Sequence, residues 1–245
     1  MKICAVQIRP IAGEIAVNIV RHLNFIEFAI AQEANLVFFP ELSLTGYEPR
    51  LAKSLATDKT DHRLDVFQQR TDAHNIIIGV GLPISAESKV QIGMVWFAPN
   101  APRRDYAKQQ LQDDELPFFV RGNGQLMLNV AGHTLAPAIC FESLQPKHAE
   151  DAANMGADIY LASVAKPARV MAKAVLHYPA IARKHKLHVI MSDCVGPSDN
   201  FMSVGKSAAW NNRGELLAQM DSESEGIIIL DTATDQASIH ESLGI

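Results

Sequence analysis

Short apolar runs alternate with longer segments of helical periodicity along almost the whole chain, and this alternation restricts the folds that the chain can adopt. The first apolar run covers residues 2–8. The segment after it carries aliphatic residues at the spacing of one helix face: Ile19, Leu23, Ile26 and Ile30. Because strands and amphipathic helices are interleaved in this way, the sequence predicts an α/β layered fold and not separate helical and sheet domains.

The other apolar runs predict further strands, some of them paired as hairpins or neighbours. These strands are expected at residues 35–41, 75–83, 90–99, 125–130, 133–140, 157–163 and 187–193. Helices are expected at residues 61–74, 143–156 and 167–186. The helix at 143–156 is predicted to begin with Ser143 at its N-cap and to end at Gly156. Residues 204–230 are predicted to close the fold as a meander of short strands.

The charge balance argues against polyanionic partners. The sequence has 22 lysine and arginine residues against 27 aspartate and glutamate residues, with no block of five like charges. Nucleic acid and anionic membrane are therefore poor partners, and a small or neutral ligand is expected instead. A hydrophobic content of 48% is enough for a large core, so we expect one domain over residues 1–245.

The cysteines and the apolar segments indicate the compartment. Cys4, Cys140 and Cys194 are widely spaced and form no CxxC pair, which predicts free thiols. No apolar run approaches the roughly 18 residues of a membrane span. The apolar run at the N-terminus is too short for a signal peptide. We therefore expect a cytoplasmic protein.

Common metal and nucleotide motifs are missing from the sequence. There is no HExxH motif, and "HKLH" at residues 185–188 fits the basic end of a helix better than a metal site. The "GVG" at residues 79–81 lacks the further glycine of a dinucleotide fingerprint, and there is no P-loop. We expect neither a metal nor a cofactor.

Cys140 ends the apolar run in "APAICFESLQPKHAE" and is a candidate nucleophile. A cysteine between a strand and a helix start lies near unpaired helix N–H groups, which favour a thiolate and an oxyanion. The alternative is that Cys140 packs as a small hydrophobic residue, as free cysteines often do. An ordinary thiol, with a pKa near 8.5, also needs a neighbouring base to react efficiently at neutral pH.

Glu41 and Lys108 are the charged residues whose positions suggest a role in chemistry. Glu41 follows an apolar strand and Pro40, and partial burial there would raise its pKa and suit it to proton transfer. It could instead only cap the following loop. Lys108 in "RRDYAKQQL" could serve an oxyanion if it is buried, but most lysines are simply solvated.

Three motifs in this order resemble the signatures of the nitrilase-type carbon–nitrogen hydrolases: "FFPELSLTGY", "YAKQQL" and "AICFE". The resemblance extends over nearly the whole chain, from the opening strand and the Asn18-bearing helix to "MGADIYLAS" and "VGKSAAWNNRGELLAQM". It implies a four-layer αββα sandwich. It also implies that Glu41, Lys108 and Cys140 act as a triad.

In such a triad the resemblance assigns each residue a role. Glu41 takes the Cys140 proton, and the thiolate attacks an amide-like carbonyl to give a thioester that water hydrolyses. Lys108 and the backbone N–H of Phe141 stabilise the oxyanion. Glu115, seven residues after Lys108, matches a second glutamate that often positions the lysine and the substrate. The alternative for Glu115 is an acidic surface loop with Asp113 and Asp114.

Two positions depart from the family pattern and leave the substrate open. Asp193 and Cys194 in "SDCVG" occupy a segment where an asparagine is common, and "LASVAKPAR" is followed by no tryptophan. The leading hypothesis is hydrolysis of a small linear amide, as in ω-amidases or aliphatic amidases. Nitrile hydrolysis, acyl transfer and a non-catalytic interaction protein are the alternatives. The resemblance also predicts a homodimer or larger homo-oligomer, with the helix from Ala168 to Lys186 as the candidate interface.

Overall fold

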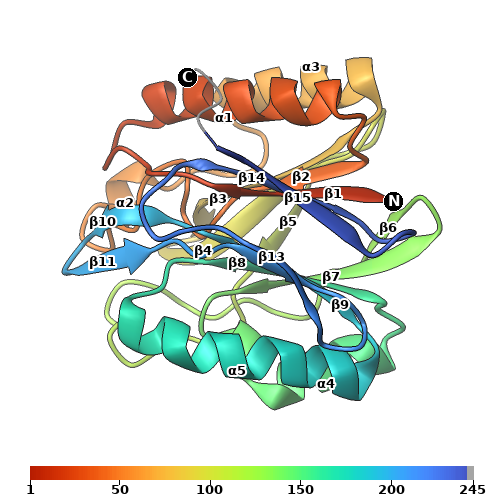
Figure 1. Cartoon of the computed structure of the whole chain (residues 1–245). Helices are drawn as coiled ribbons and strands as arrows, with labels where there is room; N and C mark the ends of the chain where they lie inside the picture. Colours follow the sequence, from red (N-terminus) through yellow and green to blue (C-terminus); the bar gives the residue numbers. More distant parts are fainter. Residues whose placement is uncertain (242–245) are drawn as a thin grey trace.

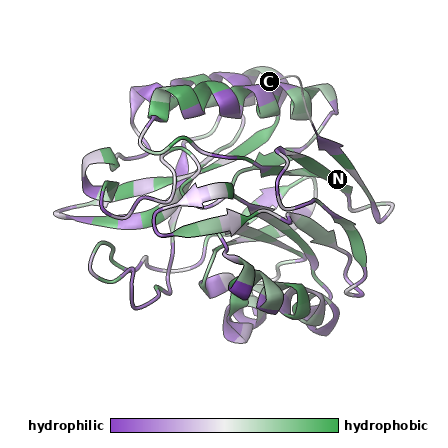
Figure 2. Cartoon of the chain, turned by 60° about the vertical axis from the view of Figure 1, so that its left-hand side comes forward, coloured by the Kyte–Doolittle hydropathy of each residue, from purple (hydrophilic) through white to green (hydrophobic). Residues whose placement is uncertain are grey.

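Two β-sheets are stacked face to face, and helices cover the outer face of each sheet (Figure 1). The computed structural model describes residues 1–241. Figure 2 shows hydrophobic residues concentrated on the strands between the two helical layers, whereas the helices also carry hydrophilic residues. The four-layer αββα sandwich expected from the motifs is therefore confirmed.

The first sheet has a parallel centre, β1–β2–β3, extended by antiparallel strands on both sides. Its seven strands follow one another in space as β15 (Gln236–Glu241), β14 (Gly226–Asp231), β1 (Lys2–Gln7), β2 (Leu36–Phe38), β3 (Ile77–Ala86), β4 (Lys89–Phe97) and β5 (Arg104–Ala107). Residues 3–6 of β1 and all of β2 are apolar because both faces of these strands are covered, one by helices and one by the second sheet.

The second sheet repeats this plan with a parallel centre, β7–β8–β9. Its six strands are, in spatial order, β13 (Leu216–Gln219), β12 (Ala208–Trp210), β9 (His188–Asp193), β8 (Ile159–Val164), β7 (His133–Ile139) and β6 (Leu128–Val130). A separate hairpin of β10 (Val195–Ser198) and β11 (Phe201–Val204) extends from the end of β9. The carboxyl ends of parallel strands in each sheet are where ligand sites usually form.

Helices form the two outer layers. α1 (Ile15–Ala31) and α3 (Asp65–His74) cover the first sheet, and α4 (Pro146–Asn154) and α5 (Ala168–His185) cover the second (Figure 1). Pro146 stands at the first position of α4, where its missing N–H is tolerated. Short connecting turns complete the set: α2 (Ala52–Leu55) and the 3₁₀ helices η1 (His62–Leu64) and η2 (Glu142–Leu144).

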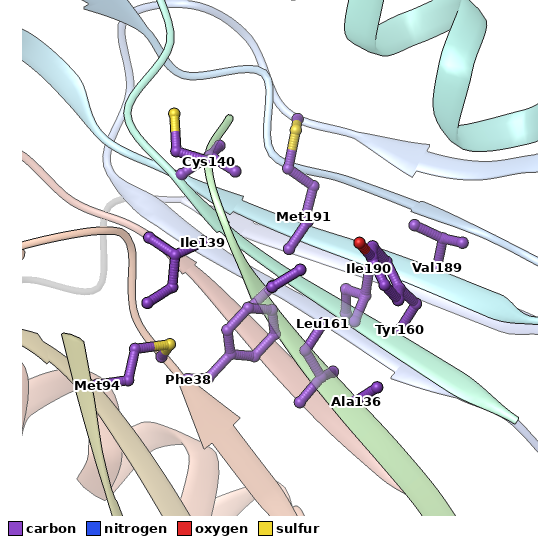
Figure 3. Packing of buried hydrophobic residues seen from close by; sticks show 14 of the residues in the cluster. Phe38, Met94, Ala136, Ile139, Cys140, Tyr160, Leu161, Val189, Ile190 and Met191 are labelled. Carbon is purple, nitrogen blue, oxygen red and sulfur yellow. The ribbon is translucent and has the colours of Figure 1, made fainter. Parts of the chain in front are cut away.

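The main hydrophobic core lies between the two sheets. Phe38 of β2 and Met94 of β4 face Ala136 and Ile139 of β7 in Figure 3. A second cluster joins the first sheet to α1 and α3 and includes Phe25 and Phe67. β2 and β7 therefore meet across a rigid core, which fixes the positions of the loops that follow them.

Two expectations about the fold are wrong in part. The end of the chain is no simple meander. β12 and β13 lie in the second sheet, whereas β14 pairs with β1 in the first sheet, where Ile3 faces Leu230. The buried face of α1 is also shifted relative to the predicted one. Asn18 and His22 are fully buried there, whereas Ile19 and Leu23 are only partly covered.

Within residues 1–241, every helix is too short or too polar to cross a membrane. A cytoplasmic location and a single domain over residues 1–245 stay predictions.

Candidate active site

Glu41, Lys108 and Cys140 come from three different strand ends and meet between the two sheets. Glu41 follows β2, Lys108 directly follows β5, and Cys140 directly follows β7. Their exposed fractions are 1%, 0% and 4%. Lys108 is therefore not a solvated side chain. The Glu41 carboxylate accepts from Lys108 and, among residues 1–241, from no loop N–H, so it does not cap the loop either.

Lys108 is held by two carboxylates. Its Nζ donates to Glu41 Oε1 at 2.8 Å and to Glu115 Oε1 at 2.6 Å. Glu115 also accepts from the Tyr47 hydroxyl at 2.9 Å and from the Gln112 N–H at 2.8 Å. Glu115 is 1% exposed, so it is not part of an acidic surface loop. A lysine ammonium has three N–H donors, and two of them are used here.

The second oxygen of Glu41 is free. Glu41 Oε2 is buried and has no hydrogen-bond partner among residues 1–241. Burial raises the pKa of Glu41, the Lys108 charge lowers it, Glu115 raises it again, and the neighbouring Cys140 thiol lowers it, with a net increase. Burial alone would lower the pKa of Lys108, but Glu41 and Glu115 raise it on balance, so Lys108 stays charged.

Cys140 occupies a strained turn directly after β7. Its φ is 48°, in the left-handed region that residues other than glycine rarely adopt. The backbone N–H of Cys140 donates to Ser163 O at 2.9 Å, and its thiol donates to Ala165 O at 3.5 Å. In Figure 3 the Cys140 sulfur points away from the hydrophobic cluster below it. Burial is the main cause that raises the pKa of Cys140 to about 12, with Glu41 raising it further.

The turn after Cys140 differs from the predicted helix start. Residues 142–144 form η2, and α4 begins only at Pro146 with Gln145 as its N-cap. Ser143 is not the cap of α4, because its hydroxyl donates to Cys140 O at 2.6 Å and contacts the Tyr178 hydroxyl. The Phe141 N–H has no acceptor within residues 1–241 and is free to face a substrate oxygen.

Glu142 joins the loop of Lys108 to the loop of Cys140. Its Oε1 accepts from Ile139 N–H at 2.8 Å and from the Tyr106 hydroxyl at 2.6 Å, and its Oε2 accepts from Gln109 N–H at 2.6 Å. Glu142 is fully buried. It therefore fixes the backbone beside two of the three candidate residues and does not line the cavity.

Replacing Glu142 by glutamine is expected to weaken this link. The new amide group would face the Gln109 N–H or the Ile139 N–H, so one buried donor would lose its acceptor. We expect the free energy of unfolding to fall by about 1–3 kcal/mol, and kcat/KM to fall roughly tenfold to a hundredfold as the loops shift. Urea unfolding and steady-state kinetics would measure both, with the exposed Glu87→Gln as the control. Unchanged stability and activity in E142Q would contradict this role.

The loop that carries Glu41 is held from α1 and from β3. His22 contacts Asn18 O at 2.6 Å and the Ser43 hydroxyl at 2.9 Å, and burial lowers its pKa to about 3. On the other side, a Cβ on Gly81 would lie 2.3 Å from Pro40 O. The "GVG" segment therefore has a steric function, because only glycine lets β3 approach this loop so closely.

Lys166 was not singled out from the sequence, although it lies beside the nucleophile. It is fully buried, and its Nζ lies 3.2 Å from Cys140 O and 3.8 Å from Cys140 Sγ. Its backbone N–H donates to Asp193 Oδ1 at 3.0 Å. The signal in the sequence is a charged residue inside the largely apolar segment "LASVAKPAR", just before the position where the family tryptophan is missing.

A cavity of about 430 Å³ opens above Cys140. Tyr47 comes from the loop after Glu41, and Asn200 and Phe201 come from the hairpin of β10 and β11. Gln112, Asp114 and Arg169 add polar and charged groups. Of the three candidate residues, Cys140 is the one that lines this cavity. In the described part of the chain, no three His, Cys, Asp or Glu side chains are grouped as a metal site would require.

Comparisons with known proteins agree with this geometry. The sequence model of the carbon-nitrogen hydrolase family matches residues 2–239. A nitrilase of Pyrococcus abyssi is 27% identical over 92% of this chain and 86% of its own length. A glutamine-dependent NAD(+) synthetase of Aquifex aeolicus is 25% identical over 91% of this chain, which spans only 40% of that relative. The solved amidase of Nesterenkonia sp. AN1 has a TM-score of 0.87 at 21% identity, over 96% of this chain and 92% of its own.

Proposed function

The chain belongs to the carbon-nitrogen hydrolase family, and on that basis we propose that it hydrolyses a small linear amide through a thioester on Cys140. The observation that supports this most strongly is the buried Glu41 carboxylate beside the Cys140 thiol, with Oε1 bound to Lys108 and Oε2 free among residues 1–241. A carboxylate placed in this way can accept the thiol proton and later return it.

Acylation follows from the donors around the sulfur. Glu41 takes the proton from Sγ, and the sulfur attacks the carbonyl carbon of the amide. The third N–H of Lys108 and the Phe141 N–H stabilise the negative charge that develops on the substrate oxygen, and such donors contribute about 3–4 kcal/mol each in comparable sites. Glu41 then gives its proton to the leaving nitrogen, and ammonia or an amine departs.

Deacylation uses the same groups in reverse. Water enters from the cavity, Glu41 accepts one of its protons, and the resulting hydroxide attacks the thioester carbon. Collapse of the second tetrahedral intermediate releases the carboxylic acid and returns the proton to Cys140. Glu115 keeps Lys108 in place throughout, through the 2.6 Å contact with its Nζ.

The dimensions of the cavity and two related structures support a small linear amide. One mutant of the Nesterenkonia amidase is in complex with butyramide, and another carries the acetamide moiety of fluoroacetamide at its active-site cysteine. A cavity of about 430 Å³ would accept ligands of this size or somewhat larger. Nitrile hydrolysis and acyl transfer remain alternatives, since the same nucleophile could serve both.

The test is a panel of substrates with two measurements. Butyramide, glutamine, other small amides, ureides and nitriles would be incubated with the protein while ammonia release is measured and Cys140 acylation is followed by intact mass. We expect amides to give equimolar ammonia and acid, with a transient acyl adduct. If no member of a broad panel acylates Cys140, the hydrolase proposal is wrong. If added amines capture most of the acyl group in place of water, the reaction is acyl transfer.

We further propose that the chain forms a homodimer or larger homo-oligomer through the α5 face. Leu176 on α5 is 75% exposed, and Val175 beside it is 36% exposed, so this helix presents apolar surface. Such a face fits an interface better than it fits water.

A further inference from the structure

The active site contains two buried lysines that contact different members of the proton-transfer pair. Lys108 Nζ lies 2.8 Å from Glu41 Oε1, on the base. Lys166 Nζ lies 3.8 Å from Cys140 Sγ, on the nucleophile. Lys166 also donates to Cys140 O at 3.2 Å, so its ammonium is fixed against the strained turn that carries the sulfur.

The two lysines act on the proton in opposite directions. A cation on Glu41 favours its carboxylate form, and this makes Glu41 a weaker base for the Cys140 thiol. A cation on the sulfur favours the thiolate, and this makes Cys140 a stronger acid. Transfer of the proton from Cys140 to Glu41 therefore loses part of the Lys108 attraction and gains that of Lys166.

We propose that Lys166 is a fourth catalytic residue of this site, which holds the Cys140 sulfur as a thiolate while Glu41 carries the proton. This assignment rests on the proposed amide hydrolysis. No proton is added or lost in the step, because the one that leaves Sγ is bound by Glu41 and Lys166 keeps its own. Lys166 acts again in deacylation, when the C–S bond breaks and its electron pair returns to sulfur.

The charges around Lys166 keep it protonated. Burial alone would lower its pKa, but Cys140, Tyr178, Asp193 and Glu41 raise it on balance. Asp193 is fully buried and accepts from the Lys166 N–H through Oδ1, and burial raises the pKa of Asp193 well above its usual range although Lys166 lowers it. The charged groups that influence Cys140 itself are Glu41, Lys166, Lys108 and Glu115, and of the two lysines Lys166 has the larger effect on its pKa.

The experiment measures the reactivity of the sulfur directly. Full-length wild type and Lys166→Met, which replaces the ammonium with a neutral chain of similar length, would be alkylated with iodoacetamide at a series of pH values. Intact mass and peptide mapping would follow Cys140 separately from Cys4 and Cys194. In K166M we expect alkylation at pH 7 to slow by about tenfold or more and its midpoint to move at least about one unit to higher pH. Lys166→Arg should restore part of the rate.

A second variant separates an electrostatic role from a structural one. Lys166→Arg keeps a positive charge beside the sulfur, so its midpoint should stay close to that of wild type, whereas the midpoint of K166M should lie at higher pH. A merely structural role would slow alkylation in both variants without a difference between their midpoints. An unchanged midpoint in folded K166M overturns the proposal. If K166M does not fold, the neutral variant Lys166→Gln takes its place, and an unchanged midpoint in that variant overturns the proposal.

The result is independent of turnover. If wild type hydrolyses no amide but the midpoint rises in K166M and not in Lys166→Arg, the proposed function is wrong and the assignment of Lys166 stands. If amides are hydrolysed and K166M keeps the wild-type midpoint, the assignment of Lys166 is wrong and the proposed function stands.

Discussion

Replacing Cys140 by alanine is expected to reduce turnover of every amide substrate by about 10⁵-fold or more, because loss of the nucleophile in a triad is about as damaging as loss of the whole triad. Without the sulfur there is no thioester, and water would have to attack the amide directly. The fold should survive, because alanine has the same Cβ and meets the same strain at φ 48°. Ammonia release and circular dichroism would measure activity and folding.

Cys4→Ala is the matched control for this variant. Cys4 is also a fully buried free cysteine, but it lies on β1 in the cluster beneath α1 and α3. Cys4→Ala should change amide turnover by less than about twofold, because it alters packing in the core but removes no reacting group. Retained amide turnover in folded C140A would instead rule out covalent catalysis by Cys140.

Replacing Glu41 by glutamine is expected to lower kcat/KM by about 10³–10⁴-fold, the upper range for loss of a general acid–base group. Glutamine keeps an oxygen for Lys108 but cannot take the thiol proton.

In wild type, activity should be lost as pH falls, when Glu41 becomes protonated before it can act. Because burial raises the pKa of Glu41, the midpoint of that loss should lie above the ordinary value of 4.5. The pH dependence of kcat/KM for a neutral amide would measure it.

Glu115→Gln provides the comparison. Glu115 contacts Lys108 and Tyr47 but does not reach the sulfur in any described contact. Its substitution should disturb the position of Lys108 and cost roughly 10–100-fold in kcat/KM. If E115Q were as damaging as E41Q, or if the wild-type acid midpoint lay below 4.5, Glu41 would not be the base.

The candidate site could be predicted from the sequence through the family resemblance, because each of the three motifs lies at the end of a strand. Pro40 marks the end of the segment that carries Glu41, and Cys140 follows directly on an apolar run. Lys166 was harder to find because a lysine beside a proline resembles a solvated loop. In the structure Lys166 is fully buried and its carbonyl accepts from the Val204 N–H of β11 at 3.0 Å, and no local pattern reports such a contact.

The errors in the predicted fold have the same cause, because contacts between distant segments leave no local pattern. Asn18 and His22 are polar, so a search for apolar periodicity placed the buried face of α1 one residue too far along. Their burial is explained by hydrogen bonds to Leu44 O and to the Ser43 hydroxyl. Both partners lie in the loop after β2, more than 20 residues further along the chain. The local sequence also could not show which sheet β14 joins, because a short apolar strand fits either sheet.

The pairing of β1 with β14 has a consequence for synthesis on the ribosome. Lys2 faces Asp231 and Gln7 faces Gly226, so β1 gains this neighbour only after the chain has been made as far as residue 231. Until then β2 is the only strand of the first sheet that can pair with β1, and the other edge of β1 exposes unpaired backbone groups. The nascent chain therefore has a long interval in which this edge can pair with the wrong partner, and completion of the first sheet should be a late event in folding.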